Sequence, residues 1–182
     1  MGHVAKVGSW GELYVMLGTS SAALIGLLFV ATSLHLEEIV NNAIYRTLAR
    51  SSSIYLLVTL VEAACILTPQ PVRALGFEII ALNLVALGFV GRNFYFFLSH
   101  PDVSQRGGLR IYRGLTFIVA FLAGIAGGLG LLTDANWALY LVTASYVVVV
   151  IAAALTAWAI MLGVGYGETK EKGRRTKRNT RG

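Results

Sequence analysis

The sequence contains very little charge for its length. Of its 182 residues only 13% are Asp, Glu, Lys or Arg, whereas 56% are hydrophobic. Soluble globular domains have about 25% charged residues, which cover the surface that faces water. The shortage excludes a soluble domain of this length, because its charged residues are too few to cover such a surface.

Cysteine is scarce and catalytic motifs are lacking. The single cysteine, Cys65, excludes an intrachain disulfide. The sequence has no P-loop, HExxH, CxxC, GxSxG or dinucleotide-binding pattern. None of its histidines, His3, His35 and His100, is expected at the depth of the acids inside the apolar runs. We therefore expect no enzyme activity, no catalytic residue, no cofactor and no metal site.

Long apolar runs dominate the chain instead, and runs of about 18 residues or more are typical of membrane-spanning helices. We predict an all-α integral membrane bundle of five transmembrane helices. The expected membrane domain is residues 1–167, followed by a basic tail at residues 168–182. The approximate spans are residues 12–36, 50–68, 74–98, 113–132 and 137–164.

Lysine and arginine are divided unequally between the two sides that five spans create. The side with the N-terminus holds only Lys6 and Arg73, and the other side holds the rest of the 15 basic residues. Basic loops remain on the cytoplasmic side of a membrane. This imbalance predicts an N-terminus outside and a C-terminus in the cytoplasm.

Two carboxylates interrupt the apolar spans. Glu62 and Glu78 flank the turn that begins at Pro69, and at a rise of ~1.5 Å per residue both lie roughly 7–10 Å below it. Acids inside a span usually face the bundle interior and are candidates for function. We expect them to share one polar layer with hydroxyls of the first and last spans, namely Ser20, Ser21, Thr143 and Ser145.

This polar layer has two interpretations that the sequence leaves open. The acids and hydroxyls could relay protons or bind a hard cation through oxygen. Alternatively, Glu78 pairs with Arg73, and Glu62 bonds to a serine of the first span as a contact between helices. We expect Asn83, deeper in the third span, to be a contact of this second kind.

Small residues recur every four positions in two spans. They are Gly18, Ala22 and Gly26 in the first span and Gly124 and Gly128 in the fourth. Such faces let helix backbones approach closely. The spacing favours packing within one chain and leaves open a homo-oligomer or another membrane-protein partner.

The tail is strongly basic. It holds seven basic and two acidic residues, a net charge of +5 against +6 for the whole chain. A segment of this composition is expected to be disordered and attracted to anionic lipid headgroups. Such a tail could serve only to anchor the topology of the chain, and contact with a cytoplasmic or membrane partner is an alternative. Nucleic acid is disfavoured because aromatics for base stacking are lacking. The basic residues are Lys170, Lys172, Arg174, Arg175, Lys177, Arg178 and Arg181.

The segment GTSSAALIGLLFVATSLHLEEIV, Gly18 to Val40, resembles a first-span pattern of largely uncharacterised small multispanning proteins of the bacterial inner membrane. Some of these proteins are labelled modulators of the FtsH membrane protease. The pattern there reads TGLLFVAxSLHL, and this chain has Ile25 in place of its threonine. The resemblance implies a multi-pass location in the bacterial inner membrane and a partner-binding role.

Two functions follow as hypotheses. The first is an accessory or regulatory membrane protein that acts through helix packing and its basic tail. The alternative is a small proton or cation carrier or channel that uses Glu62 and Glu78 as a pair.

Overall fold

The structure is a computed structural model that describes residues 10–41, 43–98 and 107–179, with side chains described for 10–37, 39–41, 46–95, 112 and 114–158. All regular secondary structure in these ranges is helical, which confirms the all-α prediction for them. The helices are α2 (Gly11–Leu34), α3 (Leu36–Asn41), α4 (Ala43–Leu67), α5 (Val72–Leu98), α6 (Gly107–Leu132) and α7 (Ala138–Asn179).

Five of these helices are long and apolar enough to cross a membrane, as the apolar runs predicted. The candidate spans begin and end within a few residues of the expected positions, apart from a later end expected for the last one. They are Gly11–Leu34, Arg46–Leu67, Val72–Tyr95, Gly114–Leu132 and Ala138–Trp158.

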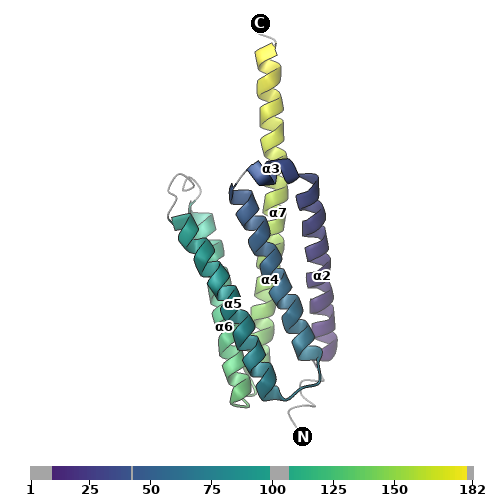
Figure 1. Cartoon of the computed structure of the whole chain (residues 1–182), viewed down its shortest axis with the longest axis vertical. Coiled ribbons are helices and arrows are strands. Elements are labelled where there is room, and N and C mark those ends of the chain that lie inside the picture. Colours follow the sequence, from purple (N-terminus) through teal and green to yellow (C-terminus); the bar gives the residue numbers. More distant parts are fainter. Residues whose placement is uncertain (1–9, 42, 99–106, 180–182) are drawn as a thin grey trace.

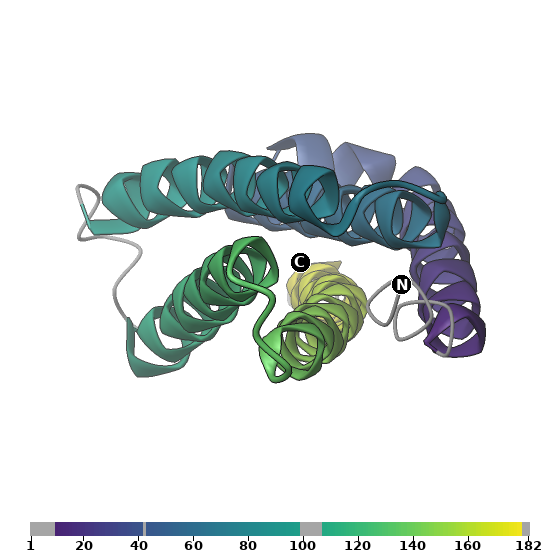
Figure 2. The same cartoon turned by 90° about the horizontal axis from the view of Figure 1, so that it is seen from below.

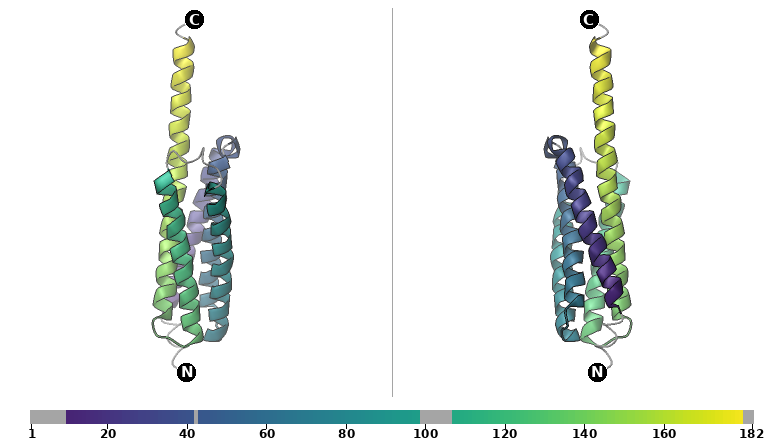
Figure 3. Two further views of the ribbon diagram at one scale, coloured as in Figure 1. Left: turned by 90° about the vertical axis from the view of Figure 1, so that its left-hand side faces the viewer. Right: turned by 90° about the vertical axis from the view of Figure 1, so that its right-hand side faces the viewer.

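The five long helices form a bundle that is two helices thick. Helices α4 and α5 make one layer, and α6 and α7 make the other (Figures 2 and 3). Helix α2 closes one edge, where it packs mainly on α4 and also touches α7. Helix α4 contacts α2, α5 and α7, and α6 packs against both α5 and α7 (Figure 1).

Glycines of α6 bring its backbone close to both neighbours. A Cβ on Gly128 would lie 2.7 Å from Ile80 and 3.1 Å from the carbonyl oxygen of Gly76 in α5. A Cβ on Gly127 would lie 2.6 Å from Val142 of α7. The predicted small-residue face of the fourth span therefore packs within the chain.

The small-residue face of α2 is only partly used in this way. A Cβ on Gly18 would lie 3.2 Å from Ala63 of α4, which is a close helix contact. Ala22 is exposed, and no described atom lies within 4 Å of a Cβ placed on Gly26. Leu28 and Ala31, farther along α2, are buried, and of the residues of this face Gly18 alone makes the expected close approach to the described residues.

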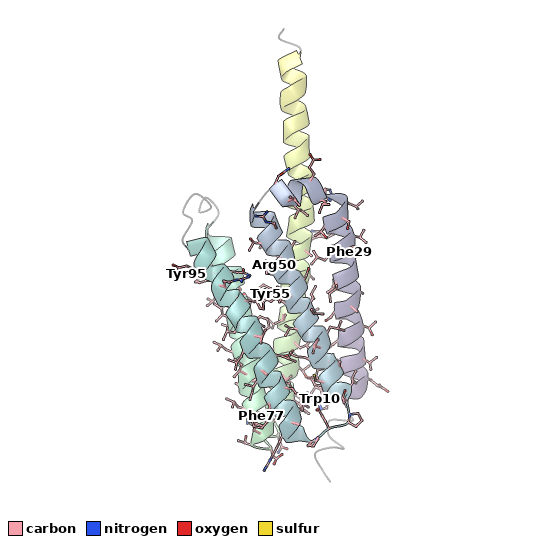
Figure 4. The ribbon with its side chains drawn as sticks, viewed as in Figure 1. Trp10, Phe29, Arg50, Tyr55, Phe77 and Tyr95 are labelled. Carbon is pink, nitrogen blue, oxygen red and sulfur yellow. The ribbon has the colours of Figure 1, made fainter. Side chains whose placement is uncertain are left out.

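The outside of the bundle is apolar on every long helix. Phe29, Phe77 and Tyr95 point outward from α2 and α5, whereas Tyr55 points between the helices (Figure 4). Phe29 is 71% exposed and Tyr95 is 74% exposed. Large exposed apolar surfaces mark contact with lipid or protein rather than with water.

Helix α7 continues beyond the other helices to Asn179 (Figure 1). Residues 168–179 therefore differ from the disordered tail that we expected. Glu, Lys and Arg have high intrinsic helix propensity, and no proline interrupts the helix after its apolar part. Continuation of a helix that is already formed avoids the cost of nucleating a new one.

We predict that Gly128→Ala lowers the free energy of unfolding by about 1–3 kcal/mol, because the added methyl group clashes with α5. Gly26→Ala is the matched control. It adds the same methyl group where space is open, and alanine favours a helix over glycine by about 0.5–1 kcal/mol. Reversible unfolding in mixed detergent micelles measures both variants. Equal effects of the two substitutions would contradict the α5–α6 contact.

Candidate buried polar site

A buried carboxyl group lies between α4 and α5. Glu62 of α4 is 4% exposed and Asn83 of α5 is 1% exposed. The Nδ2 of Asn83 donates hydrogen bonds to Oε1 of Glu62 and, over 2.8 Å, to the backbone oxygen of Ile79. The two N–H bonds of the amide are thus both used, and the second one fixes the direction in which the amide points.

Helix α6 makes room for this contact because it has a glycine, Gly124, beside Asn83. The amide of Asn83, with Oδ1 nearest, fills the position that a Cβ of Gly124 would occupy. Any larger residue at position 124 would push the amide away from Glu62. One glycine, one amide and one carboxyl group therefore tie together three helices, α6, α5 and α4.

A second polar group lies one turn away on α4, where Thr59 is fully buried. The Oγ of Ser21 from α2 is 3.3 Å from Oγ1 of Thr59 and 3.0 Å from the hydroxyl of Tyr146 from α7. Thr59 also donates to the backbone oxygen of Leu56 over 2.9 Å. We call Ser21, Thr59 and Tyr146 the hydroxyl cluster.

Two further contacts extend polar bonding across the bundle. The hydroxyl of Tyr14 in α2 is 2.7 Å from Oγ1 of Thr143 in α7. Ser145 of α7 donates to the backbone oxygen of Ala120 in α6 over 2.7 Å. Side chains of α2, α4, α5 and α7 and a backbone oxygen of α6 therefore take part in polar contacts between the helices.

The expected site residues are divided between the interior and the surface. Glu62, Ser21 and Ser145 are buried, and Thr143 is partly buried. Ser20 is exposed and bonds only locally, donating to the Met16 backbone oxygen of its own helix over 2.8 Å.

Glu78 is exposed and has its own partner. It accepts a hydrogen bond of 2.8 Å from Nε2 of Gln70, which also donates to the backbone oxygen of Cys65. Glu62 and Glu78 thus bond to different residues, and the partner of Glu62 is Asn83 rather than a serine of the first span. Gln70 rather than Arg73 is the residue that bonds to Glu78.

Sequence reasoning placed Asn83 among the helix contacts but did not pair it with Glu62, and it passed over Tyr14, Thr59 and Tyr146. A lone amide in an apolar span was a usable signal, because such a group needs a partner. The tyrosines resembled ordinary interface or core residues. The basic residues of the tail lie beyond the described side chains, and Arg181 lies outside the described residues altogether.

Comparison of the chain with protein-family models, with curated proteins and with solved structures finds no match. Any function must therefore be inferred from the residues of the chain and their arrangement. Among the described residues, no group of three or more His, Cys, Asp or Glu side chains could hold a metal ion. What the site offers chemically is one carboxyl group, one amide and a set of bonded hydroxyls.

We predict that Asn83→Leu lowers the free energy of unfolding by about 1–3 kcal/mol, because it leaves the buried Glu62 carboxyl group without its donor. The double variant Glu62→Leu/Asn83→Leu is expected to recover most of this loss, since neither polar group then needs a partner. Unfolding in mixed detergent micelles gives the coupling between the two positions. Ser20→Ala is the control and should change stability by less than about 0.5 kcal/mol. Additive effects at 62 and 83 would argue against the hydrogen bond.

Proposed function

We propose that this chain is a multi-pass protein of the bacterial inner membrane that serves as an accessory or regulatory subunit. Its N-terminus faces outward, its C-terminus lies in the cytoplasm, and its basic tail contacts a membrane-protein partner. The observation that carries the proposal is the projection of α7 past the end of the bundle, with six of the seven basic residues of the tail on it. A charged helix held clear of the bundle is suited to contact with another molecule.

The arrangement of the helix ends supports this orientation. The start of α2, the turn between α4 and α5 and the turn between α6 and α7 gather at one end of the bundle (Figure 1). Of the basic residues, this end holds Arg73 among the described positions. Helix α3 and the projecting part of α7 lie at the other end. The loop charges favour the cytoplasm for that end.

The resemblance of Gly18 to Val40 to first spans of proteins labelled as FtsH modulators supports the choice of an accessory role. It also supports a bacterial inner-membrane location. The alternative carrier was based on two acids at one site, and Glu62 and Glu78 bond to different partners. That geometry favours the accessory role over a two-carboxylate carrier.

We predict that the two ends of the bundle label from opposite sides of the membrane. Single cysteines would be introduced as Thr133→Cys and Lys172→Cys in a Cys65→Ser background. A membrane-impermeant maleimide should label Thr133→Cys in intact cells and Lys172→Cys only after the membrane is permeabilised. The reverse pattern would place the C-terminus outside and refute the orientation.

The accessory role predicts a protein contact of the tail. A photocrosslinking amino acid at position 176 should give a discrete protein adduct in native membranes, and the resemblance predicts that a membrane-protease complex is part of it. Two full-length variants serve as comparisons: one has the seven basic tail residues changed to glutamine, and one has the tail residues in shuffled order.

Comparison of the natural protein with the two tail variants distinguishes a specific protein partner from attraction to anionic lipid. A specific partner requires residue order, so both variants should lose the adduct. Attraction to anionic lipid requires only charge, so the shuffled tail would give the same lipid adducts as the natural one. Lipid adducts alone in the natural protein would refute the accessory role of the tail and leave it as a topology anchor.

A further inference from the structure

Glu62 is the buried titratable group that the accessory role does not use. It lies within the candidate span Arg46–Leu67 and is almost completely shielded by α4, α5 and neighbouring helices. Among the described residues it forms no ion pair and accepts a single hydrogen bond, from Asn83. A carboxylate buried with one neutral donor and no countercharge is very unfavourable, whereas a carboxylic acid in the same place is tolerated.

The direction of the Asn83 amide limits what Glu62 can bind. Because Ile79 accepts from the same Nδ2, the amide presents its N–H side to Glu62 and its oxygen to Gly124. A metal cation would meet the positive end of this amide dipole. Hard cations also need several oxygen ligands. The Asn83 amide presents no oxygen to a cation bound at Glu62, because its N–H side faces the carboxyl group.

The hydroxyls nearby do not replace those missing ligands. Ser21 lies within hydrogen-bond distance of both Thr59 and Tyr146, and Thr59 also bonds to its own helix. Glu78, the other acid of the turn region, is exposed and bonded to Gln70. A proton needs only one oxygen, and Oε2 of Glu62 is left for it once Oε1 accepts from Asn83.

We infer that Glu62 and Asn83 form a proton-binding site, in which the folded bundle holds Glu62 as a neutral carboxylic acid with its proton on Oε2. Asn83 is a positioning residue, since its N–H bond to Oε1 leaves Oε2 as the protonated atom. Gly124 gives the amide the space that this orientation requires. Loss of the proton leaves a charge at the α4–α5 contact, so the site makes that contact sensitive to pH.

The other titratable groups around Glu62 do not supply a countercharge. Tyr14 of α2, Cys65 of α4 and Tyr146 of α7 are close enough to interact with it electrostatically. All three side chains are neutral or negative, never cationic. From α5 the facing group is the uncharged Asn83, whose amide lies between Glu62 and Gly124 of α6. A negative charge on Glu62 would therefore meet no positive partner from any of these helices.

Infrared spectroscopy of the full-length protein in liposomes tests the site directly. At neutral pH the wild-type protein should show the carbonyl band of one protonated carboxylic acid, and Glu62→Gln should lack it. Glu78→Gln is the matched control and should keep the band, because Glu78 is exposed and bonds to Gln70 outside the site. Absence of the band from the wild type at neutral pH would overturn the proposal.

Two further measurements keep the test decisive. Asn83→Leu retains Glu62 but removes its donor, so it should shift the frequency of the band, and this holds even if Glu62→Gln does not fold. An unshifted band would refute the role of Asn83. Addition of Na⁺, Ca²⁺ or Mg²⁺ at constant pH should leave the wild-type band unchanged. Loss of the band with one of these ions would show a metal site in place of a proton site.

Discussion

The bundle depends on hydrogen bonds between the polar side chains that are buried among its helices. Lipid offers no hydrogen bonds, so each hydroxyl, amide or carboxyl group inside the bundle needs a partner from the protein. Phe29, Phe77 and Tyr95 occupy the outside, whereas Glu62 and Asn83 lie within. The helices are consequently joined by polar bonds as well as by apolar packing.

Helix α4 has a central place because it carries both polar groups. Thr59 bonds toward α2 and α7 through the hydroxyl cluster, and Glu62, three residues later, bonds toward α5. Residues three apart on a helix share a face. Glu62 is therefore close to the contacts that hold α2 and α7 to α4.

The two ends of the bundle have different structures, and the difference agrees with the proposed orientation. One end has short turns, and the other has α3 and the long projection of α7 (Figure 1). The short turn between α6 and α7 is closed by bonds from the backbone nitrogens of Asp134 and Ala135 to the oxygens of Leu131 and Gly130. Asp134 has a φ of 54°, the left-handed conformation that ends a helix in this way.

The sequence by itself determined the helix class and the number of long apolar helices, because these follow from residue type and spacing along the chain. The tertiary structure alone decided which polar groups meet. Depth along a helix can be counted from a turn, and this count placed Glu62 and Glu78 at a similar level. The face that each side chain occupies depends on how α4 and α5 rotate against their neighbours, and this rotation put Glu62 beside Asn83 and left Glu78 outside.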